Sequence, residues 1–335
     1  MPAGLEGRPH DNSANGQGAG LSQSITPAAP RTRNLARVLL YRVSIVIAAL
    51  AVSAIAWLGY CEYNNSRAVP PPSEAELREH FERAASWMFT HAPGIATENN
   101  PMLWVFIDEA GKLTGNAQLL EMATAYQQHY TNGTLSQFFF DPRDSEKVAG
   151  QQIHLPYYWA DYQRLFVYGS TCNDSVREDP EVLALLTPSG CEPHLMWLRS
   201  PWCHTHQLMG LRFVQNNHCE PGEETARTIN AVQDSILAEL RWDFRVEDAY
   251  LQKVMTLLES GRRKDIKPIW IKRILEAQRA DGGWDGADII AHLPGNRALV
   301  WEGGRLYPWP QTQPQTNLHA TAQGLYLLAL LLKRD

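Results

Sequence analysis

Apolar residues recur every three to four positions along most of this chain, which is the period of helices rather than of strands. The segment 317–332, NLHATAQGLYLLALLL, goes further, because it is apolar on almost every side. A helix with one apolar stripe lies on a surface, whereas a helix that is apolar all round has to be covered all round. We therefore predict that 317–333 is an inner helix of a layered all-α domain.

The other helical segments alternate between amphipathic and mostly apolar ones. Amphipathic segments, expected in an outer layer, are 73–90, 116–130, 180–186, 223–242 and 265–280, whereas apolar segments, expected in an inner layer, start at Asn100 and at 155, 200 and 317, and a further helix at 246–260 is closed by Gly261. This gives about five outer–inner pairs, with no convincing β-hairpin or βαβ unit. Such pairs form a closed α/α toroid or an open superhelix, and we favour the toroid.

A short motif near the C-terminus points to the same architecture. Residues 270–284 read WIKRILEAQRADGGW, with Gln278 followed after three residues by Gly282, Gly283 and Trp284. This stretch resembles the Gln-Trp signature of terpenoid cyclases and the related turn of protein prenyltransferase β subunits. The resemblance covers about fifteen residues, with a looser echo at His319, and it implies an α/α toroid.

The chemistry of those two families has no counterpart here. Asp281, Asp285 and Asp288 do not form the tight DxDD cluster with which class II cyclases protonate polyenes. The prenyltransferase resemblance would give His319 a zinc ion, but its companion Asp-x-Cys is missing, so we expect no metal and no other cofactor. A second group, Cys203, His204, His206, His218 and Cys219, lies at opposite ends of one expected helix and could not close on a single ion.

One segment near the N-terminus is long enough to cross a membrane. Residues 43–60 contain eighteen uncharged residues, which is about the length a bilayer core requires, although a buried core helix is the alternative. The arginines at 31, 33, 37 and 42 precede it, and this places the N-terminus in the cytosol. The expected order is a disordered cytosolic tail (1–36), a transmembrane signal anchor (37–60), a Pro-rich linker (61–72) and an exoplasmic, periplasmic or lumenal, toroid domain (73–335).

The cysteines indicate disulfides in the domain, and the net charge bears on its possible partners. Four of the five cysteines, Cys172, Cys191, Cys203 and Cys219, lie in the domain, and an even number outside the cytosol suggests two disulfides. One continuous helix would hold Cys203 and Cys219 roughly 24 Å apart, so these two should not pair with each other, and we favour Cys191 with Cys203 and Cys172 with Cys219. The net charge of −6 gives no reason to expect a nucleic-acid partner.

Candidate chemistry follows from the toroid, because inner helices direct their first turns at one mouth. Polar residues near those starts are Asn100, His154, His204, His206 and His319, and the loop 281–315 lies beside them. For proton transfer we select His319, His206, Glu302 and Asp161. Asp161, like Asp108, is included because it is a carboxylate on an expected apolar helix, where a charge is costly unless it is paired or functional. Aromatic side chains that could stack on sugar rings, together with one arginine, form the expected substrate-binding set of Trp159, Tyr162, Trp301, Arg305, Tyr307 and Trp309.

Together these features predict a membrane-anchored protein that processes or binds a glycan or a lipid-linked substrate, in the manner of a polysaccharide lyase or glycoside hydrolase. Two alternatives stay open. One is a non-catalytic binding or scaffold module of a membrane complex, with a partner membrane protein. The other is a cyclase-like or prenyltransferase-like enzyme that lacks the usual acidic and zinc motifs. The lipid bilayer is the expected partner of residues 37–60.

Overall fold

The computed structural model describes residues 31–98, 100–130, 152–153, 155–156, 159–191, 202–243, 245–246, 248–286, 289–293, 297–302, 305–310 and 316–333. The chain divides into two compact units, residues 1–55 and 56–335. The described helices are α1 (Arg31–Ser66), α2 (Glu74–Ile95), α3 (Pro101–Thr114), α4 (Ala117–Tyr130), α7 (Asp161–Thr171), α8 (Asp174–Arg177), α9 (Pro180–Leu185), α11 (Cys203–Asn216), α12 (Gly222–Trp242), α13 (Asp248–Glu259), α14 (Pro268–Ala277) and α15 (Leu318–Leu332), with a short 3₁₀ turn at Arg263–Asp265.

The fold is helical apart from one small sheet. Strands β1 (Ile289–Leu293), β2 (Arg297–Glu302) and β3 (Arg305–Pro310) form an antiparallel meander in the order β1-β2-β3. The segment expected as a loop at 281–315 therefore contains strands, and the expectation of no hairpin is wrong for this part of the chain. The signal in the sequence was weak, because Gly303-Gly304 is a hairpin dipeptide but the six residues on either side of it include one β-branched residue, Val300, and two prolines, Pro308 and Pro310.

The first unit consists, in its described part, of helix α1. Within the described residues, α1 contains the one helix that is long and apolar enough to cross a membrane, Arg37–Ser66. Its residues from 37 to 60 are exposed, as lipid contact requires. The helix begins at Arg31 rather than after residue 36, so the last six residues of the expected disordered tail are helical, and residues 1–30 lie outside the described part.

The last turns of α1, residues 56–66, belong to the second unit and are part of its core. Cys61 is 1% exposed and Asn65 is fully buried. Asn65 Nδ2 donates to the carbonyl oxygen of Asp243 at 2.8 Å, and Trp270 Nε1 donates to the carbonyl oxygen of Asn65 at 3.0 Å. The expected Pro-rich linker at 61–72 therefore starts six residues too early, because the helix continues to Ser66 and its end is packed inside the domain.

Helix starts in the second unit follow the capping signals of the sequence. Ser73 Oγ accepts from Glu76 N at 3.2 Å and starts α2, and Asn100 Oδ1 accepts from Met102 N at 3.1 Å and starts α3, with Pro101 as its first residue. Gly261 takes the left-handed conformation, with φ of 88°, just after α13. By contrast α7 begins at Asp161, six residues after the expected start at 155.

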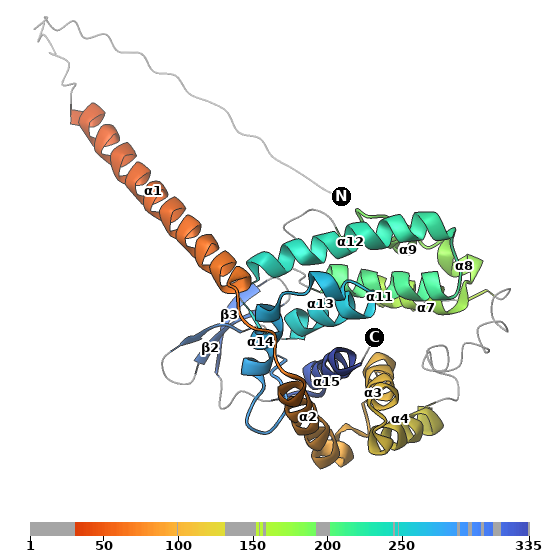
Figure 1. Ribbon diagram of the computed structural model, residues 1–335. Coiled ribbons are helices and arrows are strands. Elements are labelled where there is room, and N and C mark those ends of the chain that lie inside the picture. The colour runs from red at the N-terminus through yellow and green to blue at the C-terminus, as the bar shows by residue number, and fades with distance from the viewer. Residues whose placement is uncertain are drawn as a thin grey trace, which may run out of the picture. The chain divides into compact units, whose positions relative to one another are not determined.

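Helix α15 is covered on all sides, as its sequence predicts. Every residue from Ala320 to Leu330 is buried, and α15 packs against α13, α3 and α2 (Figure 1). Trp284, 1% exposed, lies over Gly324, where a Cβ atom would be 2.6 Å from the Trp284 ring. Further packing pairs are α3 with α4, α7 with α9 and α11, α11 with α12 and α13, and α13 with α14.

The Gln278 motif forms the turn between α14 and the sheet. Gln278 Nε2 donates to the carbonyl oxygen of Gly282 at 2.8 Å and to that of His80 at 2.9 Å. Gly282 has φ of 100°, and a Cβ atom there would be 2.3 Å from the carbonyl oxygen of Arg83, so only glycine fits. Trp284 Nε1 donates to the carbonyl oxygen of Ile274 at 2.9 Å and ties the turn back onto α14.

Candidate functional site

The first turns of four helices meet around one group of polar side chains. His206 is in the first turn of α11, and Tyr162 in that of α7 lies beside it, with ring centroids 4.0 Å apart. His319 in the first turn of α15 contacts Asp248, the first residue of α13, and the two also act electrostatically on His206. Glu98, just before α3, acts on His319 in the same way. We call Glu98, Tyr162, His206, Asp248, His319 and Gln323 the histidine site.

His319 is held at both ring nitrogens. Its Nδ1 atom is 2.9 Å from Asp248 Oδ2, and its Nε2 atom is 3.3 Å from Gln323 Nε2, one helical turn away on α15. The His319 side chain is 35% exposed and that of Asp248 is 24% exposed. Burial lowers the pKa of His319, but the charge and hydrogen bond of Asp248 and the charge of Glu98 outweigh it, so the pKa is above its ordinary value.

His206 is held in one tautomer. Its Nδ1 atom is 2.8 Å from the carbonyl oxygen of Trp202, and because a carbonyl only accepts, Nδ1 carries the hydrogen and Nε2 has the free lone pair. Burial lowers the pKa of His206 to about 4, and the positive charge of His319 acts in the same direction, against the Trp202 carbonyl and Asp248. Near neutral pH this imidazole is therefore uncharged.

The two histidines thus have pKa values shifted in opposite directions within one site. An imidazole with a raised pKa can donate a proton, and a neutral imidazole with a free Nε2 can accept one. Pairs of titratable groups whose surroundings separate their pKa values are the usual arrangement of an acid and a base in an enzyme. The geometry therefore suits proton transfer, with His319 as the acid and His206 as the base.

Other residues selected from the sequence have different surroundings. Asp161 is exposed in the first turn of α7, so it is not the buried carboxylate that its sequence context suggested. Asp108 is paired with Lys112 at 2.6 Å, one turn along α3. Trp159 is partly buried against an apolar cluster that includes Leu165 and Val176. The structure therefore brings together His206, His319 and Tyr162 from the selected set, but not Asp161.

The remaining selected residues lie on the sheet. Register pairs Glu302 with Arg305, Trp301 with Leu306, Val300 with Tyr307 and Ala298 with Trp309. Their roles in catalysis or substrate binding stay predictions. His154 and Asp288 lie outside the described residues.

Two of the acidic residues after Gln278 stabilise the turn. Asp281 Oδ1 accepts from Gly283 N at 3.2 Å, and Thr316 Oγ1 donates to Asp281 Oδ2 at 2.8 Å. Asp285 forms an ion pair with Arg279 at 3.5 Å. The Asp281 carboxylate therefore connects the two ends of the 281–316 segment through Thr316, and a backbone bridge between Asp285 and Thr316 adds to this connection.

Both favoured disulfides form. Cys172 pairs with Cys219 and Cys191 pairs with Cys203, with Cα atoms 4.9 Å and 5.8 Å apart. Because Cys203 and Cys219 are in separate disulfides, neither offers a thiolate to a metal ion with His204, His206 or His218.

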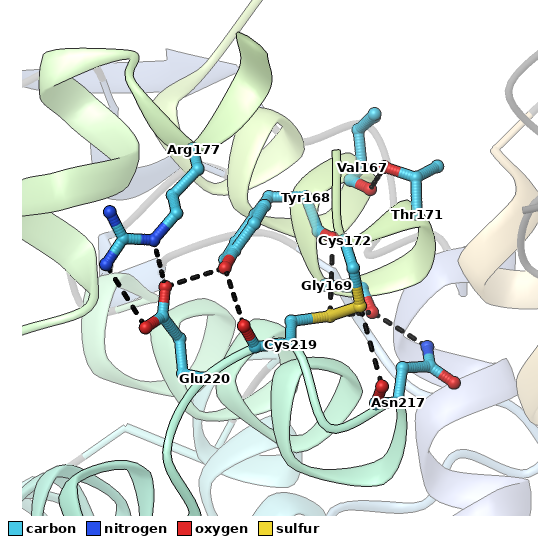
Figure 2. The surroundings of a disulfide bond; sticks show 9 residues. All are labelled: Val167, Tyr168, Gly169, Thr171, Cys172, Arg177, Asn217, Cys219 and Glu220. Atoms are coloured by element: carbon cyan, nitrogen blue, oxygen red, sulfur yellow. Dashed lines mark hydrogen bonds and ion pairs between the residues drawn. A yellow bond between two sulfur atoms is a disulfide. The ribbon is translucent and has the colours of Figure 1, made fainter. Parts of the chain in front are cut away.

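The first of these bridges lies in a polar setting, which Figure 2 shows. Tyr168 Oη donates to Glu220 Oε1 at 2.6 Å and approaches the carbonyl oxygen of Cys219 at 3.2 Å. Arg177 forms an ion pair with Glu220, and Asn217 Nδ2 donates to the carbonyl oxygen of Gly169 at 2.7 Å. The bridge thus fixes the C-terminal end of α11 to the end of α7.

Sequence reasoning missed Asp248, Gln323 and Glu98. Asp248 is 71 positions from His319, and no spacing rule connects them. The sequence shows an acidic residue near the start of the expected helix 246–260, but the meeting of that start with those of α11 and α15 depends on tertiary packing. Gln323 follows from helical geometry once His319 is chosen, since residues four apart lie on one face.

A second, buried charge network connects α11, α12 and α13. His204 Nδ1 is 2.5 Å from Glu239 Oε1, and Lys253 Nζ is 3.2 Å from Glu239 Oε2 and 2.7 Å from Asp243 Oδ2. Arg245 Nε is 3.1 Å from Asp243 Oδ1. Through the carbonyl oxygen of Asp243 this network reaches Asn65, at the end of α1.

Comparison with protein-family models, with curated proteins and with solved structures found no match to this chain. The interpretation of the histidine site therefore depends on its own geometry.

Proposed function

We propose that this protein is an enzyme of acid–base type, anchored to a membrane by α1, that processes a glycan or a lipid-linked substrate at the histidine site. The observation that carries the proposal is the pair of imidazoles with opposite pKa shifts, His319 beside Asp248 and His206 beside the Trp202 carbonyl. Such a pair removes and returns protons near neutral pH without a metal ion.

We infer that the domain lies on the extracytoplasmic side. The apolar helix near the N-terminus and the two disulfides suggest an anchored domain in an oxidising compartment. The arginines before the span favour a cytosolic N-terminus, which makes α1 a signal anchor and the domain periplasmic or lumenal.

We further propose that α2 to α15 form an α/α toroid. In its support, the first helix of the expected inner ring, α3, packs against the last, α15. The amphipathic helices α2, α4, α9, α12 and α14 each pack against a helix of that ring. A toroid also accounts for the meeting of the first turns of α7, α11, α13 and α15 at one end.

The test is turnover by the full chain in detergent, offered a panel of oligosaccharides and lipid-linked saccharides, with products followed by mass spectrometry. His319→Ala and His206→Ala should each reduce the rate by about 10²- to 10⁴-fold, the usual contribution of a general acid or base, without changing the melting temperature greatly. His91→Ala is the matched control, because His91 Nδ1 contacts the carbonyl oxygen of Trp87 at 2.8 Å, four residues back, as in His206. Full activity in either site variant would remove that histidine from the mechanism.

One observation favours a second function, that of a non-catalytic binding module. Both nitrogens of His319 are engaged, by Asp248 and by Gln323, so this ring is also suited to a fixed structural or binding role. A binding module would retain ligand in the same assay and release no product. The substitutions would then change affinity only.

A further inference from the structure

The histidine site contains two acceptor oxygens that have no partner among the described residues. Gln323 is fully buried, and its Oε1 atom accepts no hydrogen bond. Asp248 Oδ1 is also buried and unpartnered, although Oδ2 of the same carboxylate contacts His319. Buried polar atoms in folded proteins are nearly always paired, and those left over at a site are satisfied by water or by a ligand. Asp248 Oδ1 and the end of the Gln323 amide that does not face His319 therefore indicate where polar groups of a ligand would bind.

The Asp248 carboxylate indicates which kind of group the ligand must carry. Turning the Gln323 amide round would place Oε1 against His319 Nε2, which then has to carry a hydrogen, and would leave the amide NH₂ without a partner instead. Asp248 Oδ1 is an acceptor in both orientations, because an ionised carboxylate has no donor. The ligand thus needs a hydrogen-bond donor at Asp248.

Charge at the site favours a cationic donor. The charges of Asp248 and Glu98 both raise the pKa of His319, and no lysine or arginine in the described part of the chain is among the groups that shift the pKa of either histidine. Two carboxylates against one imidazolium leave a net negative charge. Helix starts carry partial positive charge, but the negative charges of Asp248 in the first turn of α13 and of Glu98 before α3 already offset it. An anionic ligand would be repelled by both carboxylates, whereas a protonated amine would be attracted by them and repelled only by the charge of His319.

An aromatic surface adjoins these acceptors. The Tyr162 ring lies beside the His206 ring at 4.0 Å, and both side chains are partly exposed. Ring faces of this kind pack against the apolar face of a sugar and attract a cation placed over them. We propose that the histidine site binds a sugar unit that carries a free amino group, with the ammonium donating to Asp248 Oδ1. This assignment rests on the proposed action on glycans and names the substrate class.

The experiment is calorimetric binding of three oligosaccharides to the full chain, kept in a polyoxyethylene detergent that has no sugar headgroup, at about pH 6, where a sugar amine is protonated. The three share one β-1,4-linked backbone and one length, and carry a free amine, an N-acetyl group or a hydroxyl group at the same position. We expect the free amine to bind about tenfold more tightly than the other two, and Asp248→Asn to abolish that preference. Glu276→Gln is the matched control, since Glu276 is an exposed carboxylate on α14.

The outcomes separate this inference from the function on which it rests. Equal or tighter binding of the N-acetyl or hydroxyl sugar would overturn the amine assignment and leave glycan binding intact. Binding of none of the three would contradict the amine assignment and the glycan function together. A preference for the free amine that survives in Asp248→Asn would exclude Asp248 as the contact. The comparison of the three sugars on the unaltered chain needs no variant, so it decides the question even if Asp248→Asn does not fold.

Discussion

Lys253 is fully buried on α13 and still charged. Its Nζ atom contacts Asp243 at 2.7 Å and Glu239 at 3.2 Å. Burial lowers the pKa of Lys253, but the two carboxylates outweigh this and raise it. Burial likewise raises the pKa of Asp243, while Lys253 and Arg245 lower it to about 2. Each charge is therefore stable in the core only because its partners are present.

Replacing Lys253 with methionine should reduce the free energy of unfolding by about 3 to 5 kcal/mol, because the buried carboxylates of Asp243 and Glu239 would lose the cation that they share. Lys272→Met, at an exposed position on α14, should change it by less than about 1 kcal/mol. Denaturant unfolding of both variants measures the difference. If the two variants lose similar amounts of the free energy of unfolding, the buried network contributes nothing to stability. Because the pKa of Asp243 is lowered, its contribution is present above its ordinary pKa and is lost as the pH falls toward about 2.

At the residue scale, the helix caps and some of the residues of the histidine site could be predicted from the sequence, but the residues that these side chains contact could not. Asn100 and Ser73 cap helices because their side chains act on residues two or three positions away. Asp161 and Asp248 both start helices, and nothing local shows that Asp248 meets His319 whereas Asp161 faces solvent. That difference depends on tertiary packing.

Helix α1 is an element with two roles, since its last turns are built into the domain. Asn65 donates to the carbonyl oxygens of Arg241 and Asp243 and accepts from Tyr250 Oη at 3.3 Å and from Arg273. A fragment that begins at residue 70, within the expected linker, would leave these groups unpaired. Buried unpaired groups cost about 1 to 3 kcal/mol each.

A fragment that starts at residue 56 should therefore be more stable to thermal unfolding than one that starts at residue 70. Within the full chain, Asn65→Ala should lower the free energy of unfolding by about 2 to 4 kcal/mol, while Tyr63→Ala, at a 66% exposed position, should have little effect. Equal melting temperatures for the two fragments would mean that the end of α1 is only a tether.

At the element scale, periodicity identified the inner helix α15 and most of the amphipathic helices, because burial of one face or of all faces is recorded in the local sequence. It missed the sheet, where strands of five and six residues carry too few positions to establish a period of two. It also placed the start of α7 too early, since aromatic residues before Asp161 continued the apolar pattern without continuing the helix.

At the scale of the whole molecule, two constraints connect distant parts of the chain. Packing of α3 on α15 joins the two ends of the domain, and the disulfides fix α11 to α7 and to the segment that ends at Cys191. Helix length excluded Cys203 with Cys219 and left two pairings, and the pairing that we favoured from the sequence is the one that forms. It did not predict that the first turns of α11, α13 and α15 would place His206, Asp248 and His319 together, although the toroid resemblance suggested that such starts converge.

The histidine pair depends on this whole arrangement and has a definite pH signature. Because the pKa of His319 is raised, its contribution to stability is present below its ordinary pKa and is lost as the pH rises through the raised value. Because the pKa of His206 is lowered to about 4, the folded chain loses stability as the pH falls from the ordinary value of about 6.5 toward 4. Proton transfer from His319 to substrate, with His206 as base, requires a pH between the two pKa values, where His319 is protonated and His206 is neutral.

The most direct test of the acid–base assignment is a titration of the histidine side chains by NMR in the full chain, with His319→Ala and His206→Ala used to assign the two signals. We predict that His206 stays neutral down to about pH 4 and that His319 stays protonated above about pH 6.5, with Asp248→Asn lowering the pKa of His319. If both histidines titrate together near pH 6.5, and Asp248→Asn changes neither, the histidine site is not an acid–base pair.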